Sequence, residues 1–176
     1  MKKQVTTRSP AGTCRFAQEI AAVVVRKPQK RAVVIALTGE LGAGKTTFAQ
    51  AFAKALGVKE RVQSPTFVLI KAYALWHTRS MERVVRGKGR CSSHTTCYPL
   101  HATKLVHIDC YRLHKPEELM RLGLWDALKD HGAIVLVEWA ERIRRALPED
   151  TVWVNFLHGS NKNERIISIH EKTRHS

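Results

Sequence analysis

Long apolar runs are missing from this 176-residue sequence, and no stretch approaches the length of a membrane span. The basic residues near its start, Lys2, Lys3 and Arg8, are not followed by an apolar core, so we expect no secretory signal. Cysteine is scarce, and four cysteines do not indicate a disulfide framework in an intracellular chain. These absences predict a cytoplasmic protein with no membrane partner, large enough for one domain with a substantial core.

Acidic residues are half as numerous as basic ones, 15 against 30, which gives a formal net charge of +15. A field of this sign attracts polyanions and speeds encounters with them. One interpretation is a nucleic-acid or ribonucleoprotein partner. The other is a basic protein without a specific polyanion contact, and composition favours neither.

A glycine-rich segment at residues 39–47, Gly-Glu-Leu-Gly-Ala-Gly-Lys-Thr-Thr, fits the pattern G-x-x-x-x-G-K-[ST] of a phosphate-binding loop. The apolar run at residues 32–37 predicts a buried strand before it. The run at residues 48–56, rich in alanine and leucine, predicts a helix after it. Strand, glycine loop and helix in this order are the context that such a loop requires.

The residue types of this loop suit phosphate chemistry. Gly39, Gly42 and Gly44 allow backbone conformations that a side chain would obstruct, so that successive N–H groups can turn inward toward phosphate oxygens. The start of the following helix adds partial positive charge. Lys45 can reach the β- and γ-phosphates, and the Thr46 hydroxyl can bind Mg²⁺.

Two further strands end in an acid. Residues 105–109 predict a short strand that ends at Asp109, and residues 133–139 predict a buried strand that carries Glu138 at its end. Phosphate-loop enzymes place a metal-side carboxylate in this way, although the pattern alone equally allows a surface acid. Thr66, in a segment expected to form a strand at 66–70, could sense the γ-phosphate, but spacing alone favours an ordinary strand threonine.

The remaining segments set the expected boundaries. Residues 1–12 predict a loose basic tail, and Thr13 is the expected N-cap of the first helix. One helix is expected after Pro116, followed by two strands at 151–156 and 165–169 that are joined by a turn at 161–163. The domain therefore spans residues 13–170, and residues 171–176 form a second tail.

Residues 74–104 interrupt this pattern as a mobile basic loop with two glycines and a proline. Two cysteines and two histidines of this loop could bind zinc tetrahedrally. Their spacing matches no zinc module, so we predict no metal site there. The four residues are Cys91, His94, Cys97 and His101.

Four sequence blocks together resemble the TsaE (YjeE) family, the ATPase component of bacterial threonylcarbamoyladenosine synthesis on tRNA. The resemblance spans about residues 13–169, apart from the basic loop. The blocks are residues 39–48, Ser64-Pro65-Thr66-Phe67, His107-Ile108-Asp109-Cys110-Tyr111-Arg112-Leu113 and Val137-Glu138-Trp139.

The resemblance implies a single α/β domain, a phosphate-loop NTPase with a mixed, mainly parallel sheet flanked by helices. It implies slow, Mg²⁺-dependent ATP hydrolysis that is stimulated by TsaB and TsaD and supports repeated turnover of that complex, which brings tRNA to the assembly. Trp139 would pack beneath the site rather than take part in the chemistry.

The resemblance also implies roles for single residues. Lys45, Asp109 and Glu138 would serve catalysis, and Thr46 and Glu138 would hold the metal, with Asp109 nearer the γ-phosphate or water; the two acids could exchange these roles. The nucleotide would contact Gly39, Gly42, Ala43, Gly44, Lys45, Thr46, Thr47, Thr66, Asp109 and one of two C-terminal basic residues, Lys162 or Arg165.

Two features depart from the family pattern. The segment between Tyr73 and His107 is much longer than usual, so the basic loop is largely an insertion, and Cys110 replaces a usual apolar residue. Two other functions remain open. A small-molecule kinase would use the basic loop as a lid, and a nucleotide-dependent RNA-binding scaffold would use the positive charge.

Overall fold

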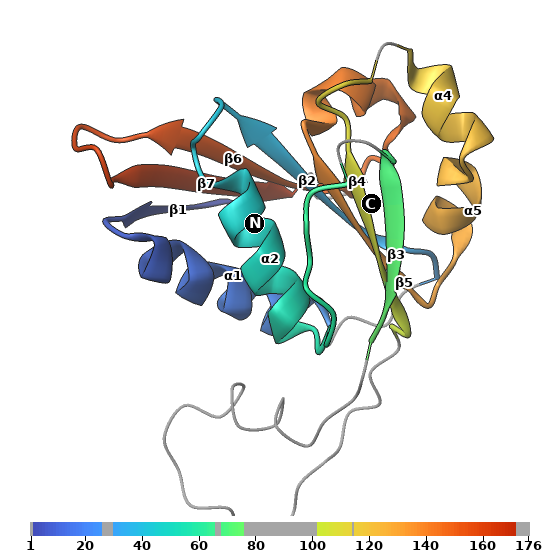
Figure 1. Ribbon diagram of the computed structural model, residues 1–176, viewed down its shortest axis with the longest axis horizontal. Coiled ribbons are helices and arrows are strands. Elements are labelled where there is room, and N and C mark those ends of the chain that lie inside the picture. The colour runs from blue at the N-terminus through green and yellow to red at the C-terminus, as the bar shows by residue number, and fades with distance from the viewer. Residues whose placement is uncertain (1, 26–29, 66–67, 76–101, 114, 172–176) are drawn as a thin grey trace, which may run out of the picture.

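The computed structural model describes residues 2–25, 30–65, 68–75, 102–113 and 115–171. These residues form a seven-stranded sheet in the order β1-β7-β6-β2-β5-β4-β3 (Figure 1). The strands are β1 (Lys2–Thr7), β2 (Val33–Gly39), β3 (Ile70–Ala74), β4 (Lys104–Asp109), β5 (Ala133–Glu138), β6 (Val152–His158) and β7 (Arg165–Glu171). Thr66, the four candidate zinc ligands and most of the basic loop lie outside the described residues.

The centre of the sheet is parallel, and its two sides are antiparallel. Strands β6, β2, β5 and β4 pair in parallel, whereas β3 adds to β4, and β7 and β1 add to β6, in antiparallel fashion. All six residues of β5 are buried, as expected for a strand that is covered on both faces. The predicted α/β class and mixed sheet are confirmed, with the parallel part confined to the centre.

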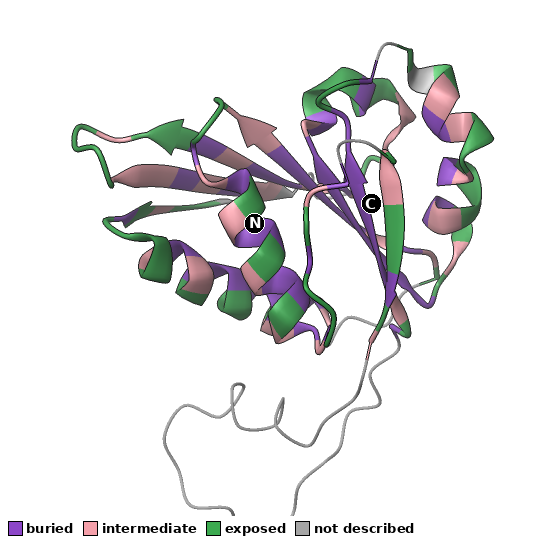
Figure 2. Ribbon diagram, in the orientation of Figure 1, coloured by how far each residue is buried: buried purple, intermediate pink, exposed green. Residues whose placement is uncertain are grey.

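Helices cover both faces of the sheet (Figures 1 and 2). On one face, α1 (Pro10–Val24) and α2 (Lys45–Ala55) pack against inward residues such as Ile35 and Leu37 of β2. On the other face, α4 (Pro116–Arg121), α5 (Leu124–Lys129) and the 3₁₀ helix η1 (Ala140–Ala146) cover Val34 and Ala36. Alternate residues of each central strand thus supply the two cores. No helix among the described residues is long and apolar enough to cross a membrane.

The N-terminal segment was predicted as a loose basic tail, and this prediction is wrong. Residues 2–7 form the edge strand β1, which pairs with β7. Helix α1 begins at Pro10, because the Ser9 side chain caps it by accepting a hydrogen bond from the Gly12 N–H at 3.2 Å. Thr13, the predicted N-cap, is instead buried in the helix, where its hydroxyl lies 3.1 Å from that of Thr7.

Two other boundaries also differ from prediction. The single helix expected after Pro116 is divided by Gly123, whose φ of 87° ends α4 and begins α5. The strand expected at 66–70 begins only at Ile70, because Leu69 has a φ of 61° and its N–H bonds back to the Pro65 carbonyl. At the C-terminus, β7 continues to residue 171 and so includes the first residue of the predicted tail.

Substitution of two loop glycines should separate backbone strain from steric collision. Gly44 has a φ of 102° but open space around a Cβ, so Gly44→Ala should cost about 1–3 kcal/mol of unfolding free energy. A Cβ on Gly39, with a φ of 120°, would lie 2.0 Å from the carbonyl oxygen of Phe156, so Gly39→Ala should cost roughly 4 kcal/mol or more. Urea denaturation measures both, and equal losses would contradict the collision at Gly39.

Candidate functional site

The phosphate-binding loop connects the end of β2 to the start of α2, as predicted. Gly39 ends the strand against the backbone of Phe156 in β6, and Gly44 precedes the helix in a left-handed conformation. No side chain of the described residues caps the N-terminus of α2. The first N–H groups of this helix are therefore available to an anion, which is the arrangement that phosphate-binding loops use.

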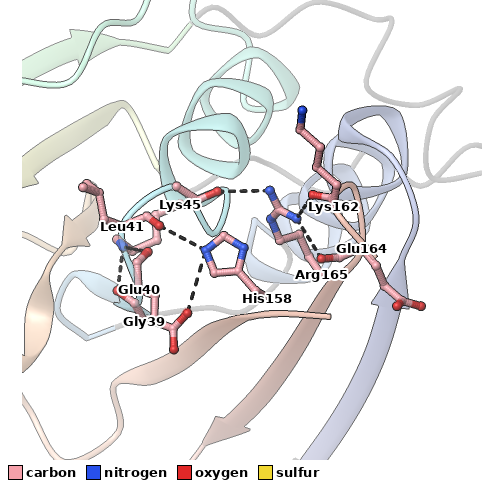
Figure 3. Close-up of polar contacts among 9 residues, drawn as sticks. Gly39, Glu40, Leu41, Lys45, His158, Lys162, Glu164 and Arg165 are labelled. Carbon is pink, nitrogen blue, oxygen red and sulfur yellow. Dashed lines mark hydrogen bonds and ion pairs between the residues drawn. The ribbon is translucent and has the colours of Figure 1, made fainter. Parts of the chain in front are cut away.

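Lys45, the first residue of α2, lies folded over the loop (Figure 3). Its ammonium group donates hydrogen bonds to the carbonyls of Gly39 at 2.7 Å and Glu40 at 2.8 Å. It also lies 3.6 Å from the centroid of the Trp139 ring, a cation–π contact. The side chain is therefore held against the start of the loop, between two of its carbonyls and the Trp139 ring.

The charge of Lys45 is partly removed from water. Burial lowers the pKa of Lys45, and four nearby carboxylates oppose this shift, in the order Glu141, Glu138, Asp109 and Glu40. The site therefore combines one buried cation with four nearby carboxylates. A negatively charged phosphate group would add a further counter-charge to this cation.

Thr46 and Glu138 lie side by side, although they are far apart in the sequence. The Thr46 hydroxyl donates a hydrogen bond to Oε2 of Glu138 at 2.8 Å. Glu138 ends β5 and is 1% exposed, whereas Thr46 is exposed in the first turn of α2. Two residues predicted to hold the metal are thus brought together.

These donor atoms fit Mg²⁺. Both are hard oxygen ligands, and their separation is close to the roughly 3 Å expected for two adjacent ligands of an octahedral Mg²⁺ ion. Across the described ranges, no group of three or more His, Cys, Asp or Glu side chains is placed to hold a metal ion. A pair of protein oxygens is sufficient for Mg²⁺, which usually takes its other ligands from water and phosphate.

Asp109 ends β4 directly opposite Glu138 in the parallel register. It is 3% exposed, and its Oδ1 accepts a hydrogen bond from the N–H of Tyr111 at 2.9 Å. Its Oδ2 accepts one from the Ser64 hydroxyl, which belongs to the Ser-Pro-Thr-Phe block. The carboxylate is therefore oriented by two segments that come from different parts of the chain.

The C-terminal hairpin, formed by β6 and β7, also contacts the phosphate-binding loop (Figure 3). Arg165 donates from Nη2 to the Gly42 carbonyl at 3.2 Å and from Nη1 to the carbonyls of Lys162 at 2.9 Å and Glu164 at 2.7 Å. The ammonium group of Lys162 points away from the Arg165 guanidinium. Of the two basic candidates, Arg165 is the one whose side chain contacts the phosphate-binding loop.

Three aromatic or imidazole groups at the site received no catalytic or binding role from the sequence. Trp139 has a φ of 57°, which turns its ring from the end of β5 over Lys45. The ring also packs on that of Tyr111, with 5.1 Å between the centroids.

The two imidazole groups lie on different sides of the site. His158 lies with Nε2 3.1 Å from the Leu41 carbonyl oxygen. His107 lies beneath Glu138. A histidine within the otherwise apolar run 105–108 was the available signal for the last of these.

Comparison with known proteins gives one consistent result. The family described as "Threonylcarbamoyl adenosine biosynthesis protein TsaE" matches residues 7–86 and 87–167. The TsaE protein of Haemophilus influenzae is 30% identical over 141 residues, which cover 80% of this chain and 73% of that protein. The TsaE protein of Rickettsia bellii is 33% identical over 156 residues, which cover 88% and 86%. Both are described as tRNA threonylcarbamoyladenosine biosynthesis proteins.

The solved structures agree with the sequence comparison. The crystal structure of Bacillus subtilis YdiB aligns with a TM-score of 0.66 and 28% sequence identity, over 98% of this chain and 87% of that one. The arrangement of strands and helices described above is therefore shared with that structure.

Cys110, next to Asp109, should be chemically inert. Burial, followed by the negative charges of Asp109 and Glu141, raises the pKa of this thiol to about 12, and Arg142 opposes the shift only in part. A thiol with such a pKa stays protonated at pH 8, so native protein should resist iodoacetamide at Cys110 and react there after denaturation. Peptide mapping by mass spectrometry measures this, and labelling of native Cys110 at the rate of the half-buried Cys14 would contradict it.

Proposed function

The chain belongs to the TsaE family, which acts in tRNA threonylcarbamoyladenosine biosynthesis, and on this premise we propose that it is a Mg²⁺-dependent ATPase. The observation that carries the proposal is the contact between Thr46 and Glu138 beside the phosphate-binding loop. It joins a hydroxyl of the loop to a carboxylate at the end of a neighbouring parallel strand, the combination with which phosphate-loop NTPases hold Mg²⁺.

The loop and the start of α2 would bind the phosphates of ATP. Backbone N–H groups between Gly42 and Thr47 would donate to phosphate oxygens, with the helix dipole adding to the attraction. The Lys45 ammonium would exchange the carbonyls of Gly39 and Glu40 for the β- and γ-phosphates, because a phosphate oxygen carries more negative charge than a carbonyl. Arg165 would approach the nucleotide from the hairpin beside Gly42.

The two acids would divide their tasks. Glu138 and Thr46 would hold Mg²⁺, which when bound neutralises charge on the transferring phosphate. Asp109 would lie nearer the γ-phosphate or the attacking water, with its orientation set by the Tyr111 N–H. Thr66, from the block that begins with Ser64, would add a contact that senses the γ-phosphate.

We further propose that this ATPase supports repeated turnover of a cytoplasmic TsaB–TsaD complex on tRNA. The support for it is membership of a family whose matched relatives are described by their part in this tRNA modification. The family relationship argues against a small-molecule kinase, and the proximity of Lys45, Thr46 and Glu138 supports hydrolysis instead.

Lys45→Ala should lower ATP turnover by at least about 100-fold, because it removes the cation nearest the transferring phosphate. Steady-state phosphate release measures the loss. Circular dichroism should show an unchanged fold, since the main packing of α2 comes from Phe48 and Phe52. Lys162→Ala is the matched control, because it also removes a lysine charge but leaves the loop contacts intact. Turnover that survives in Lys45→Ala would refute the site.

Partner dependence can be measured separately with the intact chain. ATP turnover should be slow for the protein alone and should rise when TsaB, TsaD and tRNA are added together. If turnover is unchanged by those partners, the coupling to the complex is wrong, even if hydrolysis itself is present. Salt-sensitive tRNA binding by the isolated chain that persists in Lys45→Ala would instead favour the RNA-binding scaffold.

A further inference from the structure

His107 occupies an unusual place in β4. It is 0% exposed and lies in a strand whose neighbouring residues, Leu105, Val106 and Ile108, are apolar and buried. Its Nε2 lies 2.9 Å from Oε1 of Glu138. Its Nδ1 is buried and has no hydrogen-bond partner among the residues that the structure describes. The contact to Glu138 is therefore the polar contact that the structure gives this ring.

Core packing alone does not explain an imidazole at this position. A buried polar atom without a partner destabilises the folded state, and a leucine of similar size would leave no such atom. A carboxylate oxygen accepts hydrogen bonds and an imidazole N–H donates them, so Nε2 can act as a donor to Oε1 of Glu138. The contact between Nε2 and Oε1 of Glu138 therefore accounts for a histidine at this position better than core packing does.

The carboxylate of Glu138 is held at both of its oxygens. His107 contacts Oε1 from within the core, and Thr46 contacts Oε2 at 2.8 Å from the surface side. Rotation of the carboxylate would break both contacts at once. Without His107, Thr46 alone would hold the carboxylate. Because Thr46 lies on the exposed first turn of α2, the carboxylate could then rotate and turn Oε2 away from the loop.

We propose that His107 is a positioning residue that fixes Glu138 so that Oε2 faces Thr46 and the Mg²⁺ ion. This inference rests on the proposed function and deepens it. Because His107 is fully buried beneath Glu138, it would act on the ion through Glu138 and not by direct contact. Groups that orient a metal-binding carboxylate in this way typically change metal affinity 10- to 100-fold when they are removed.

Two substitutions separate positioning from packing. His107→Gln can place its amide nitrogen near the position of Nε2 and keep a donor toward Glu138. His107→Leu keeps the volume and removes the donor. Binding of a fluorescent ADP analogue is measured in EDTA and then across a Mg²⁺ titration, which gives nucleotide affinity and Mg²⁺ affinity separately without any need for turnover.

His107→Leu should bind the analogue in EDTA as the wild type does but should need about 10–100 times more Mg²⁺ for half-saturation. His107→Gln should recover most of that loss. If His107→Leu gives the wild-type Mg²⁺ titration, the inference is wrong while the proposed function stands. If the wild type binds the analogue but does not respond to Mg²⁺, the metal site of the proposed function fails, and this inference fails with it.

Tyr73→Phe is the matched control, because the Tyr73 hydroxyl in β3 is also buried and has no partner among the described residues. Its removal should leave the Mg²⁺ titration unchanged. Thermal unfolding of each variant reports stability. His107→Leu should lose some stability because Oε1 of the buried Glu138 loses its partner, whereas His107→Gln should retain most of it. If both His107 variants lose stability and Mg²⁺ affinity together, the role is one of core packing and the positioning inference is overturned.

Discussion

The parallel register of β2, β5 and β4 is the constraint on which the site depends. It places Leu37 opposite Glu138, and Glu138 opposite Asp109, so that the three strands end at one edge of the sheet. The phosphate-binding loop begins just beyond Leu37, and its Thr46 contacts Glu138. A shift of one residue in β5 would turn Glu138 to the other face and would move every apolar side chain of that strand into the wrong core. The two cores thus maintain the geometry of the site without contributing a reactive group to it.

Charged groups lie below the surface at this edge, and each of them has a partner that makes burial tolerable. The ammonium of Lys45 is satisfied by two loop carbonyls and the face of Trp139. Asp109 accepts from a backbone N–H, and Glu138 is held between a hydroxyl and an imidazole. Burial without such partners would neutralise or displace the groups. The contacts of Asp109 and Glu138 also hold both carboxylates in fixed orientations.

Strands β6 and β7 also contact the phosphate-binding loop. The carbonyl of Phe156 in β6 lies so close to Gly39 that no side chain could be present there, and Phe156 also packs edge-on against Phe48 of α2. From the same hairpin, Arg165 bonds to the carbonyl of Gly42. Strand β1 pairs with β7, so the N-terminal segment adds a third strand to this hairpin. The loop is therefore held between the parallel centre of the sheet and its antiparallel extension.

Local patterns in the sequence were sufficient for the glycine loop between a strand and a helix and for the strands that end at Asp109 and Glu138, because each rests on residue types within one short segment. The α/β class came from the resemblance to a family, which rests on four blocks together. Local patterns were insufficient for β1, whose few apolar residues form a strand only because β7 offers a free edge, and for the break at Gly123. The sequence also left Lys162 and Arg165 equal, and it assigned His107 no role. Those questions depend on distances between segments that are far apart in the chain, and only the packing of the sheet brings the segments together.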